Sequence, residues 1–130
     1  MIGKMLGMVL IIDDNPHIRG HLRAALELEG MQVCEQDPCD RPTSEVLEPV
    51  YTVVLLDVVM PEKDGFEYLR DIRRMWPNQR LIVYSHGLDE YPQYAVKLGA
   101  DAGFDISQPA KLRQLVETAR RMACEAQKSE

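Results

Sequence analysis

The sequence predicts an α/β protein with one parallel sheet of five strands covered by helices on both faces. Short apolar runs without polar alternation recur along the chain, and the strongest are followed by segments with helical periodicity. A strand that is apolar on both sides is typical of a parallel sheet buried between helices. Repeated strand–helix units with short connections favour right-handed crossovers, which place helices on both faces.

The first half of the chain begins with a clear strand and helix. The apolar run over residues 8–12 predicts a strand. Asn15 can cap the next helix, and Pro16 suits its first turn, where the missing N–H costs nothing. Apolar residues recur at helical spacing until Gly30, a natural helix end. Two weaker elements follow: a strand over 31–36 and a short helix near Ser44–Glu48, within a proline-rich segment.

The second half begins with the most apolar strand, Val53–Asp57, which ends in a carboxylate. A turn containing Asp64 and Gly65 follows, and Phe66 to Trp76 then shows an apolar helical face closed by Pro77. The remaining expected elements are a strand over 81–84 that ends at Ser85, a helix over 91–98 stopped by Gly99, a weak strand over 103–106 and a last helix from about 109 to 127.

Composition narrows the function classes. The formal charge of -6 argues against a nucleic-acid-binding surface, which has to be basic. No segment approaches the roughly 20 apolar residues of a membrane span, so we expect no membrane partner and a cytoplasmic location. The three cysteines form no CxxC pair, which favours reduced thiols. His17 and His21 are four residues apart on the first helix, but a solvated helix face is the simpler interpretation.

Every strong strand ends in a functional group: Asp13 and Asp14 after the first, Asp57 on the third, and Ser85 on the fourth. In a parallel sheet these ends lie on one edge, where such folds bind ligands. Three carboxylates so near one another cannot all stay ionised unless a proton or a cation is present. Mg²⁺ is the natural cation, since it prefers oxygen ligands and keeps waters for a phosphate. A carboxylate beside Mg²⁺ can attack phosphorus to form an acyl phosphate, and the serine hydroxyl can donate to a phosphoryl oxygen.

These motifs, in this order, resemble the receiver domain of two-component response regulators. The resemblance rests on Asp13-Asp14, Asp57, Met60-Pro61-x-x-Asp64-Gly65, Ser85 and Gly99-Ala100-Asp101. It implies a flavodoxin-like, doubly wound sheet of strand order 2-1-3-4-5 with five helices. It also implies one stand-alone receiver domain over residues 1–130, with a core over about 7–124 and a polar tail over 125–130.

The resemblance further implies the roles of the site residues. Asp57 would accept a phosphoryl group from the phosphohistidine of a histidine kinase or phosphotransfer protein. Asp14, Asp57 and the backbone carbonyl of Val59 would ligate Mg²⁺, and Asp13 would act mainly through a bound water. Ser85 would be the switch hydroxyl that meets the phosphoryl group. A downstream target, or a second copy of the chain, would bind the face formed by the fourth helix, the fifth strand and the last helix.

The sequence departs from the family pattern near the fifth strand. The family carries a Lys seven residues after the glycine that corresponds to Gly99, and this position holds Ile106, or Ser107 if the alignment shifts by one residue. The aromatic switch position holds Gly103, or Phe104 with the same shift. His86 follows Ser85, where the family usually has a small residue. Losing a charge-assisted hydrogen bond of about 1.5–3 kcal/mol would weaken phosphorylation without preventing it.

Two other functions stay open at this stage. A pseudo-receiver, acting as a phosphorylation-independent interaction or dimerisation module, is favoured by the missing Lys and opposed by the complete set of acids. The remote alternative is an aspartate-nucleophile phosphatase of the haloacid dehalogenase type. That enzyme needs a second acid two residues after the nucleophile, and Val59 occupies this position. We therefore expect the chain not to be an enzyme.

Overall fold

One parallel sheet of five strands forms the middle layer of the molecule. The computed structural model describes residues 7–39, 51–60 and 64–128. The strand order is β2-β1-β3-β4-β5, as the resemblance to receiver domains implied. In chain order the strands are β1 (Met8–Ile12), β2 (Gln32–Gln36), β3 (Tyr51–Asp57), β4 (Arg80–Ser85) and β5 (Ala102–Asp105).

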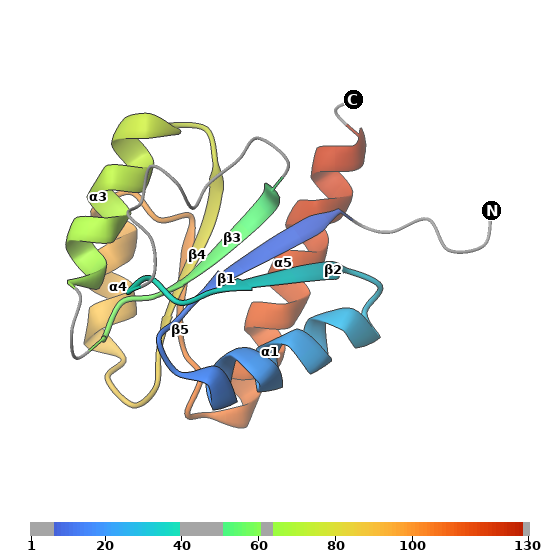
Figure 1. Ribbon diagram of the computed structural model, residues 1–130, viewed down its shortest axis with the longest axis horizontal. Coiled ribbons are helices and arrows are strands. Elements are labelled where there is room, and N and C mark those ends of the chain that lie inside the picture. Colours follow the sequence, from blue (N-terminus) through green and yellow to red (C-terminus); the bar gives the residue numbers. More distant parts are fainter. Residues whose placement is uncertain (1–6, 40–50, 61–63, 129–130) are drawn as a thin grey trace.

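Helices cover both faces of this sheet (Figure 1). On one face lie α1 (Pro16–Leu28) and α5 (Pro109–Lys128), and on the other lie α3 (Gly65–Met75) and α4 (Glu90–Lys97). The helix expected near Ser44–Glu48 lies outside the described residues. The last helix runs through Lys128, one residue beyond its expected end at about 127. Within the described ranges, no helix is long and apolar enough to cross a membrane.

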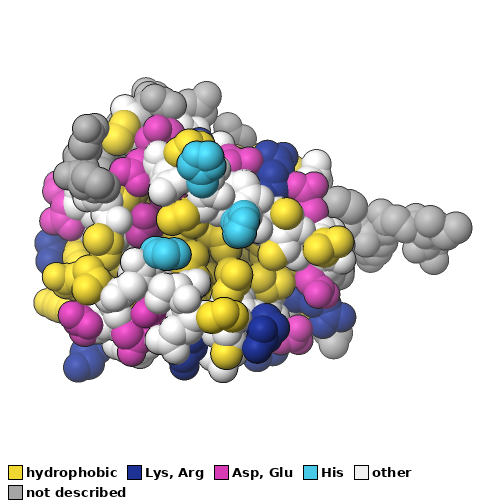
Figure 2. Space-filling model, turned by 90° about the horizontal axis from the view of Figure 1, so that it is seen from below, with side chains coloured by type: hydrophobic (Ala, Val, Ile, Leu, Met, Phe, Trp, Pro, Cys, Tyr) yellow, Lys and Arg dark blue, Asp and Glu magenta, His cyan; other side chains and the backbone are white. Residues whose placement is uncertain are grey.

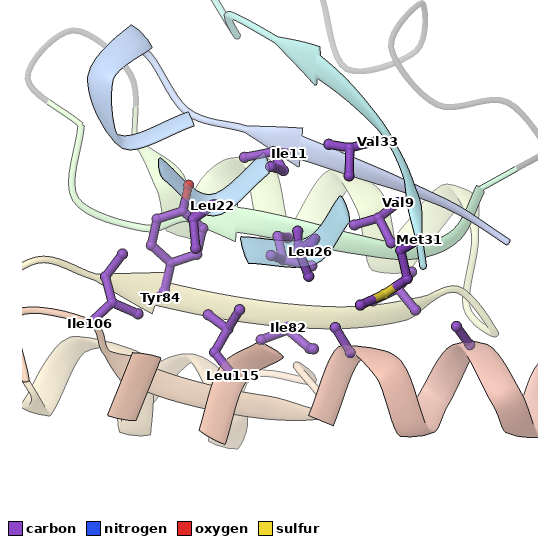
Figure 3. Packing of buried hydrophobic residues seen from close by; sticks show 14 residues of the cluster. Val9, Ile11, Leu22, Leu26, Met31, Val33, Ile82, Tyr84, Ile106 and Leu115 are labelled. Atoms are coloured by element: carbon purple, nitrogen blue, oxygen red, sulfur yellow. The ribbon is translucent and has the colours of Figure 1, made fainter. Parts of the chain in front are cut away.

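Side chains alternate between the two faces along each central strand. Val9, Ile11, Val53, Leu55, Ile82 and Tyr84 pack under α1 and α5, whereas Leu10, Ile12, Val54, Leu56, Leu81 and Val83 pack under α3 and α4. Figure 3 shows the first of these clusters, with α5 below the sheet. Because both faces are buried, the strands carry apolar residues at every position, which is the pattern that indicated a parallel sheet.

The first and third helices begin at capped turns just beyond strand ends. The Asn15 side chain accepts hydrogen bonds from the N–H groups of His17 and Ile18, as expected for the cap of α1. Asp64 caps α3 in the same way, accepting from Phe66 and Glu67. Each cap satisfies N–H groups that the first turn of a helix leaves unpaired. The helix starts are thereby held next to the carboxyl edge of the sheet.

The fourth helix lies unusually close to β5. A Cβ atom added at Gly103 would lie 2.5 Å from the backbone carbonyl oxygen of Pro92 in α4. No real Cβ contact is that short, so α4 occupies the space that a side chain at position 103 would need. The contact excludes an aromatic side chain at this position unless the helix moves.

Gly103→Ala is expected to lower the free energy of unfolding by about 1–3 kcal/mol, the usual cost of overpacking, because backbone rather than a flexible side chain must move. The matched control is Gly20→Ala in the exposed face of α1, where nothing lies within 4 Å of the added Cβ. That change should stabilise by about 0.5–1 kcal/mol, since alanine favours helix. Urea unfolding of the two variants tests the contact, and equal effects would contradict it.

Candidate functional site

Three carboxylates meet at the carboxyl edge of the sheet. Asp13 follows β1, Asp57 ends β3, and these strands are neighbours with Ile12 opposite Leu56. Asp13, Asp14 and Asp57 each offer an oxygen atom, and these atoms lie within 4.8 Å of one another. Among the described residues, this is the one group of acidic, histidine or cysteine side chains close enough to hold a metal ion.

Backbone and side-chain donors hold the two inner carboxylates in place. Asp13 is fully buried, and its Oδ1 accepts the Asn15 N–H at 2.8 Å while its Oδ2 accepts the Tyr84 hydroxyl at 2.7 Å. Asp57 is 7% exposed, and its Oδ1 accepts the Val59 N–H at 2.9 Å. These bonds fix the orientation of both groups before any ligand binds.

The close packing of the acids changes their protonation. Burial, together with the charge of Asp13, raises the pKa of Asp57 from its ordinary 3.8 to about 8, against the opposing effect of the Val59 N–H. Burial also raises the pKa of Asp13, which the hydrogen bonds from Asn15 and Tyr84 oppose. Without a cation, the Asp13–Asp57 pair therefore keeps a proton at neutral pH.

The donor set fits a hard divalent cation. Carboxylate oxygens are the ligands that Mg²⁺ prefers, and a cation removes the repulsion that raises these pKa values. The acids open onto a cavity of about 570 Å³, whose lining includes Asp14, Asp57 and Val59. The nearby guanidinium of Arg19 donates to the backbone carbonyl of Asp13 and to Glu35. Arg19 thus forms hydrogen bonds with Glu35 and with backbone rather than with the side chains of the three acids, which stay available to a metal cation.

The structure places Ser85 at the end of β4, as expected, and its hydroxyl is bonded to the backbone of the following loop. Ser85 is buried, and its Oγ donates to the backbone carbonyl of Leu88 at 2.9 Å. His86 is exposed and lines the acidic cavity together with Asp14 and Asp57. The serine must leave the Leu88 carbonyl before it can donate to a group bound at Asp57.

The positions that depart from the family pattern have distinct surroundings. Ile106 is buried in the cluster under α1 and α5, whereas the Ser107 hydroxyl donates to Asp105 Oδ1 at 2.7 Å. Phe104 packs on the α1/α5 face, away from α4, which contacts β5 at Gly103. In the part of the chain that the structure describes, the aromatic side chain of β5 therefore lies on the opposite face from α4.

Sequence reasoning missed two polar residues beside the site. Tyr84 bonds Asp13, and Asp105 accepts hydrogen bonds from the Gly87 N–H and from Ser107. The tyrosine carried a usable signal, because a buried tyrosine hydroxyl usually finds a partner and this one stands in a strand of aliphatic residues. Asp105 gave no such signal for its contact with Gly87, because that loop is distant in the sequence and its position depends on tertiary packing.

All three histidines of the chain surround a second cavity of about 250 Å³, next to the acidic one (Figure 2). His17 and His21 come from α1 and His86 from the loop after β4, and the cavity between them is lined by apolar residues including Ile18 and Ile106. His17 and His21 are exposed, as expected for a solvated helix face. Their ring nitrogens do not form a compact ligand group with a third residue within the described ranges.

A five-stranded parallel sheet in this order, with an acidic carboxyl edge, defines a flavodoxin-like α/β protein. A family model described as the response regulator receiver domain matches residues 9–120. The chain belongs to this family of two-component signalling domains.

Curated relatives include larger regulators. The KDP operon transcriptional regulatory protein KdpE of Escherichia coli (strain K12) is 36% identical over 109 residues, which cover 82% of this chain and 47% of KdpE. The transcriptional regulatory protein ResD of Bacillus subtilis (strain 168) is 31% identical over 93 residues, covering 72% of this chain and 39% of ResD. The chain thus spans less than half the length of these two relatives.

Solved structures show the same fold. The receiver domain of the Francisella response regulator 1452 aligns with a TM-score of 0.76 at 21% identity, covering 92% of this chain and 98% of that one. The response regulator protein TrrA of Thermotoga maritima, solved in complex with Mg(2+)-BeF, aligns with a TM-score of 0.75 at 22% identity, covering 89% and 98%.

The raised pKa of Asp57 gives the metal-free protein a defined pH dependence. A group with a raised pKa stabilises the fold fully below its unfolded value of 3.8, and this contribution is lost as the pH rises to about 8. The stability of the wild type relative to Asp57→Asn should therefore fall with pH, by at most about 1.4 kcal/mol per pH unit. Urea unfolding in EDTA measures the difference, and a difference independent of pH across this window would contradict the raised pKa.

Proposed function

We propose that this chain accepts a phosphoryl group on Asp57 from the phosphohistidine of a histidine kinase or a phosphotransfer protein. The observation that carries the proposal is the convergence of Asp13, Asp14 and Asp57 at the edge of the sheet, with Asp57 held by the Val59 N–H. A rigid strand end presents the nucleophile to a cavity that is open to a partner. Membership of the receiver family supports the same role.

Asp14, Asp57 and the backbone carbonyl of Val59 would hold Mg²⁺, and Asp13 would contribute through a bound water. Bound Mg²⁺ supplies positive charge that neutralises the phosphoryl oxygens and keeps the carboxylates ionised. The raised pKa of Asp57 explains why a cation would be needed, because a protonated carboxyl is a poor nucleophile. The complex of the related Thermotoga protein with Mg(2+)-BeF supports a cation in a fold of this type.

The reaction transfers one phosphoryl group between two side chains. A carboxylate oxygen of Asp57 forms a bond to phosphorus while the phosphorus–nitrogen bond of the donor histidine breaks, and the imidazole nitrogen keeps the electron pair. Within this chain, the Val59 N–H orients the attacking carboxylate. Burial of Asp13 and Asp57 limits the water around the reacting groups.

The switch would operate through the loop after β4. The Ser85 hydroxyl now donates to Leu88, and a phosphoryl group on Asp57 would offer it a charged acceptor instead. Releasing Leu88 would free the start of α4 to move. The face of α4, β5 and α5, where Tyr91 and Tyr94 are exposed, would then bind a downstream target or a second copy of the chain.

A second candidate is a pseudo-receiver, a binding module that is independent of phosphorylation. Two observations favour it. Neither candidate Lys position, Ile106 or Ser107, carries a basic side chain, and α4 contacts Gly103, one of the two candidate positions of the aromatic switch. Both affect stabilisation and read-out of the phosphoryl group. Neither removes the nucleophile or the acidic cluster, so phosphorylation is the function that we favour.

Incubation with acetyl phosphate and Mg²⁺ should add the mass of one phosphoryl group, and peptide mapping should place it on Asp57. Asp57→Asn should take up none, and Asp14→Ala should slow uptake about tenfold or more because a ligand of the cation is lost. EDTA should abolish uptake in the wild type.

The matched control is Asp89→Asn, which removes an exposed carboxylate outside the acidic group and should be phosphorylated like the wild type. Absence of a phosphoryl group from the wild type, under conditions that phosphorylate another receiver domain, would favour the pseudo-receiver. A phosphoryl group on another residue would contradict the assignment of Asp57.

A further inference from the structure

Tyr84 reaches across the sheet to a carboxylate two strands away. Its strand, β4, pairs with β3, where Asp57 lies opposite Tyr84, and β3 in turn pairs with β1, which leads to Asp13. Neighbouring strands are about 4.8 Å apart, so only a long side chain can pass over Asp57 to the end of β1. The Tyr84 hydroxyl does so and donates to Asp13 Oδ2 at 2.7 Å.

The surroundings of this hydroxyl are apolar. Tyr84 is 1% exposed and packs among Leu22, Ile106 and Leu115 in the cluster under α1 and α5. Figure 3 shows Ile106 beside the tyrosine, whose hydroxyl points towards Leu22 and the end of β1. In such an environment a hydrogen bond to a charged acceptor is strong, and an unpaired hydroxyl or carboxylate is costly.

Asp13 depends on this donor. The carboxylate is fully buried, and apart from the proton that it shares with Asp57 its hydrogen-bond donors are the Asn15 N–H and the Tyr84 hydroxyl. Only the second comes from a side chain. Neither candidate position for a basic residue supplies another, because the Ile106 side chain has no donor, its N–H bonds the Ser85 carbonyl, and the Ser107 hydroxyl bonds Asp105.

We propose that Tyr84 is a positioning residue of the acidic site, and that its hydroxyl supplies a donor to Asp13 from β4. It does so at a site whose two candidate Lys positions after β5 hold Ile106 and Ser107. A hydroxyl orients the carboxylate without adding positive charge. This donor therefore brings no positive charge that would compete with a divalent cation, whereas an ammonium group at the same place would. The effect on phosphorylation rests on the proposed function, but the bond between Tyr84 and Asp13 does not.

A double-mutant cycle in the metal-free protein tests the bond itself. Tyr84→Phe, Asp13→Ala and the double variant are unfolded with urea in EDTA at neutral pH. Tyr84→Phe should lower the folding equilibrium constant at least about tenfold when Asp13 is present, and much less in the Asp13→Ala background. Tyr68→Phe is the matched control, since it removes a hydroxyl of equal burial on the other face of the sheet. It should show no coupling to Asp13→Ala.

A second experiment separates positioning from packing. With acetyl phosphate and saturating Mg²⁺, Tyr84→Phe should be phosphorylated about tenfold more slowly than the wild type, although the ring is retained. Adding Ile106→Lys should restore most of the rate. Residue 106 packs beside the tyrosine ring, and a lysine at this position offers an amine as a replacement donor. Tyr68→Phe should react at the wild-type rate.

The results of these two experiments distinguish a failure of the Tyr84 proposal from a failure of the proposed function. Coupling below about twofold in the cycle would overturn the proposal, as would a wild-type phosphorylation rate in Tyr84→Phe or a slowed rate that Ile106→Lys does not restore. If the wild type itself takes up no phosphoryl group, the proposed function fails. The cycle, which needs neither metal nor phosphate, then still decides the role of Tyr84.

Discussion

Repulsion among three carboxylates is the constraint on which the rest of the site depends. Asp13, Asp14 and Asp57 bring oxygen atoms within 4.8 Å, and two of these groups are buried. The fold tolerates them because donors hold Asp13 and Asp57, while burial and mutual charge raise the pKa of Asp57 to about 8. A proton relieves the repulsion only partly. A divalent cation offsets more of this negative charge than a proton does, and the charge left on the three carboxylates therefore suits the edge to binding such a cation.

The alternation of side chains in the strands places the proposed phosphoryl acceptor and the proposed switch on opposite faces of the sheet. Asp57 and Tyr84 belong to the row that faces α1 and α5, whereas Ser85 and Gly103 belong to the row that faces α4. A change at Asp57 must therefore pass around the strand ends, through the loops, to reach α4. The bond from Ser85 to Leu88 lies on that route, at the start of the loop that leads into α4.

Asp105, at the end of β5, connects two loops through hydrogen bonds. Asp105 accepts the Gly87 N–H at 2.8 Å and two hydrogen bonds from Ser107, and the Ser107 hydroxyl holds the pKa of Asp105 below its ordinary value. Asp105 thereby ties the loop after β4 to the loop after β5. The Asp105 carboxylate therefore anchors both loops next to the apolar side chain of Ile106. On the face that α1 and α5 cover, the Tyr84 hydroxyl donates to Asp13.

Local patterns determined the strands, four of the helices and their succession along the chain, because apolar runs, caps and strand-end acids are properties of neighbouring residues. The order of the strands in the sheet followed only from the resemblance to receiver domains. Local patterns also predicted that Asp13, Asp14 and Asp57 would meet, since parallel strands end on one edge. Only the tertiary structure decided that Tyr84 crosses β3 to reach Asp13 and that Pro92 fills the space beside Gly103. Such contacts join elements distant in the sequence, and their geometry depends on how closely the helices pack on the sheet, which no local pattern records.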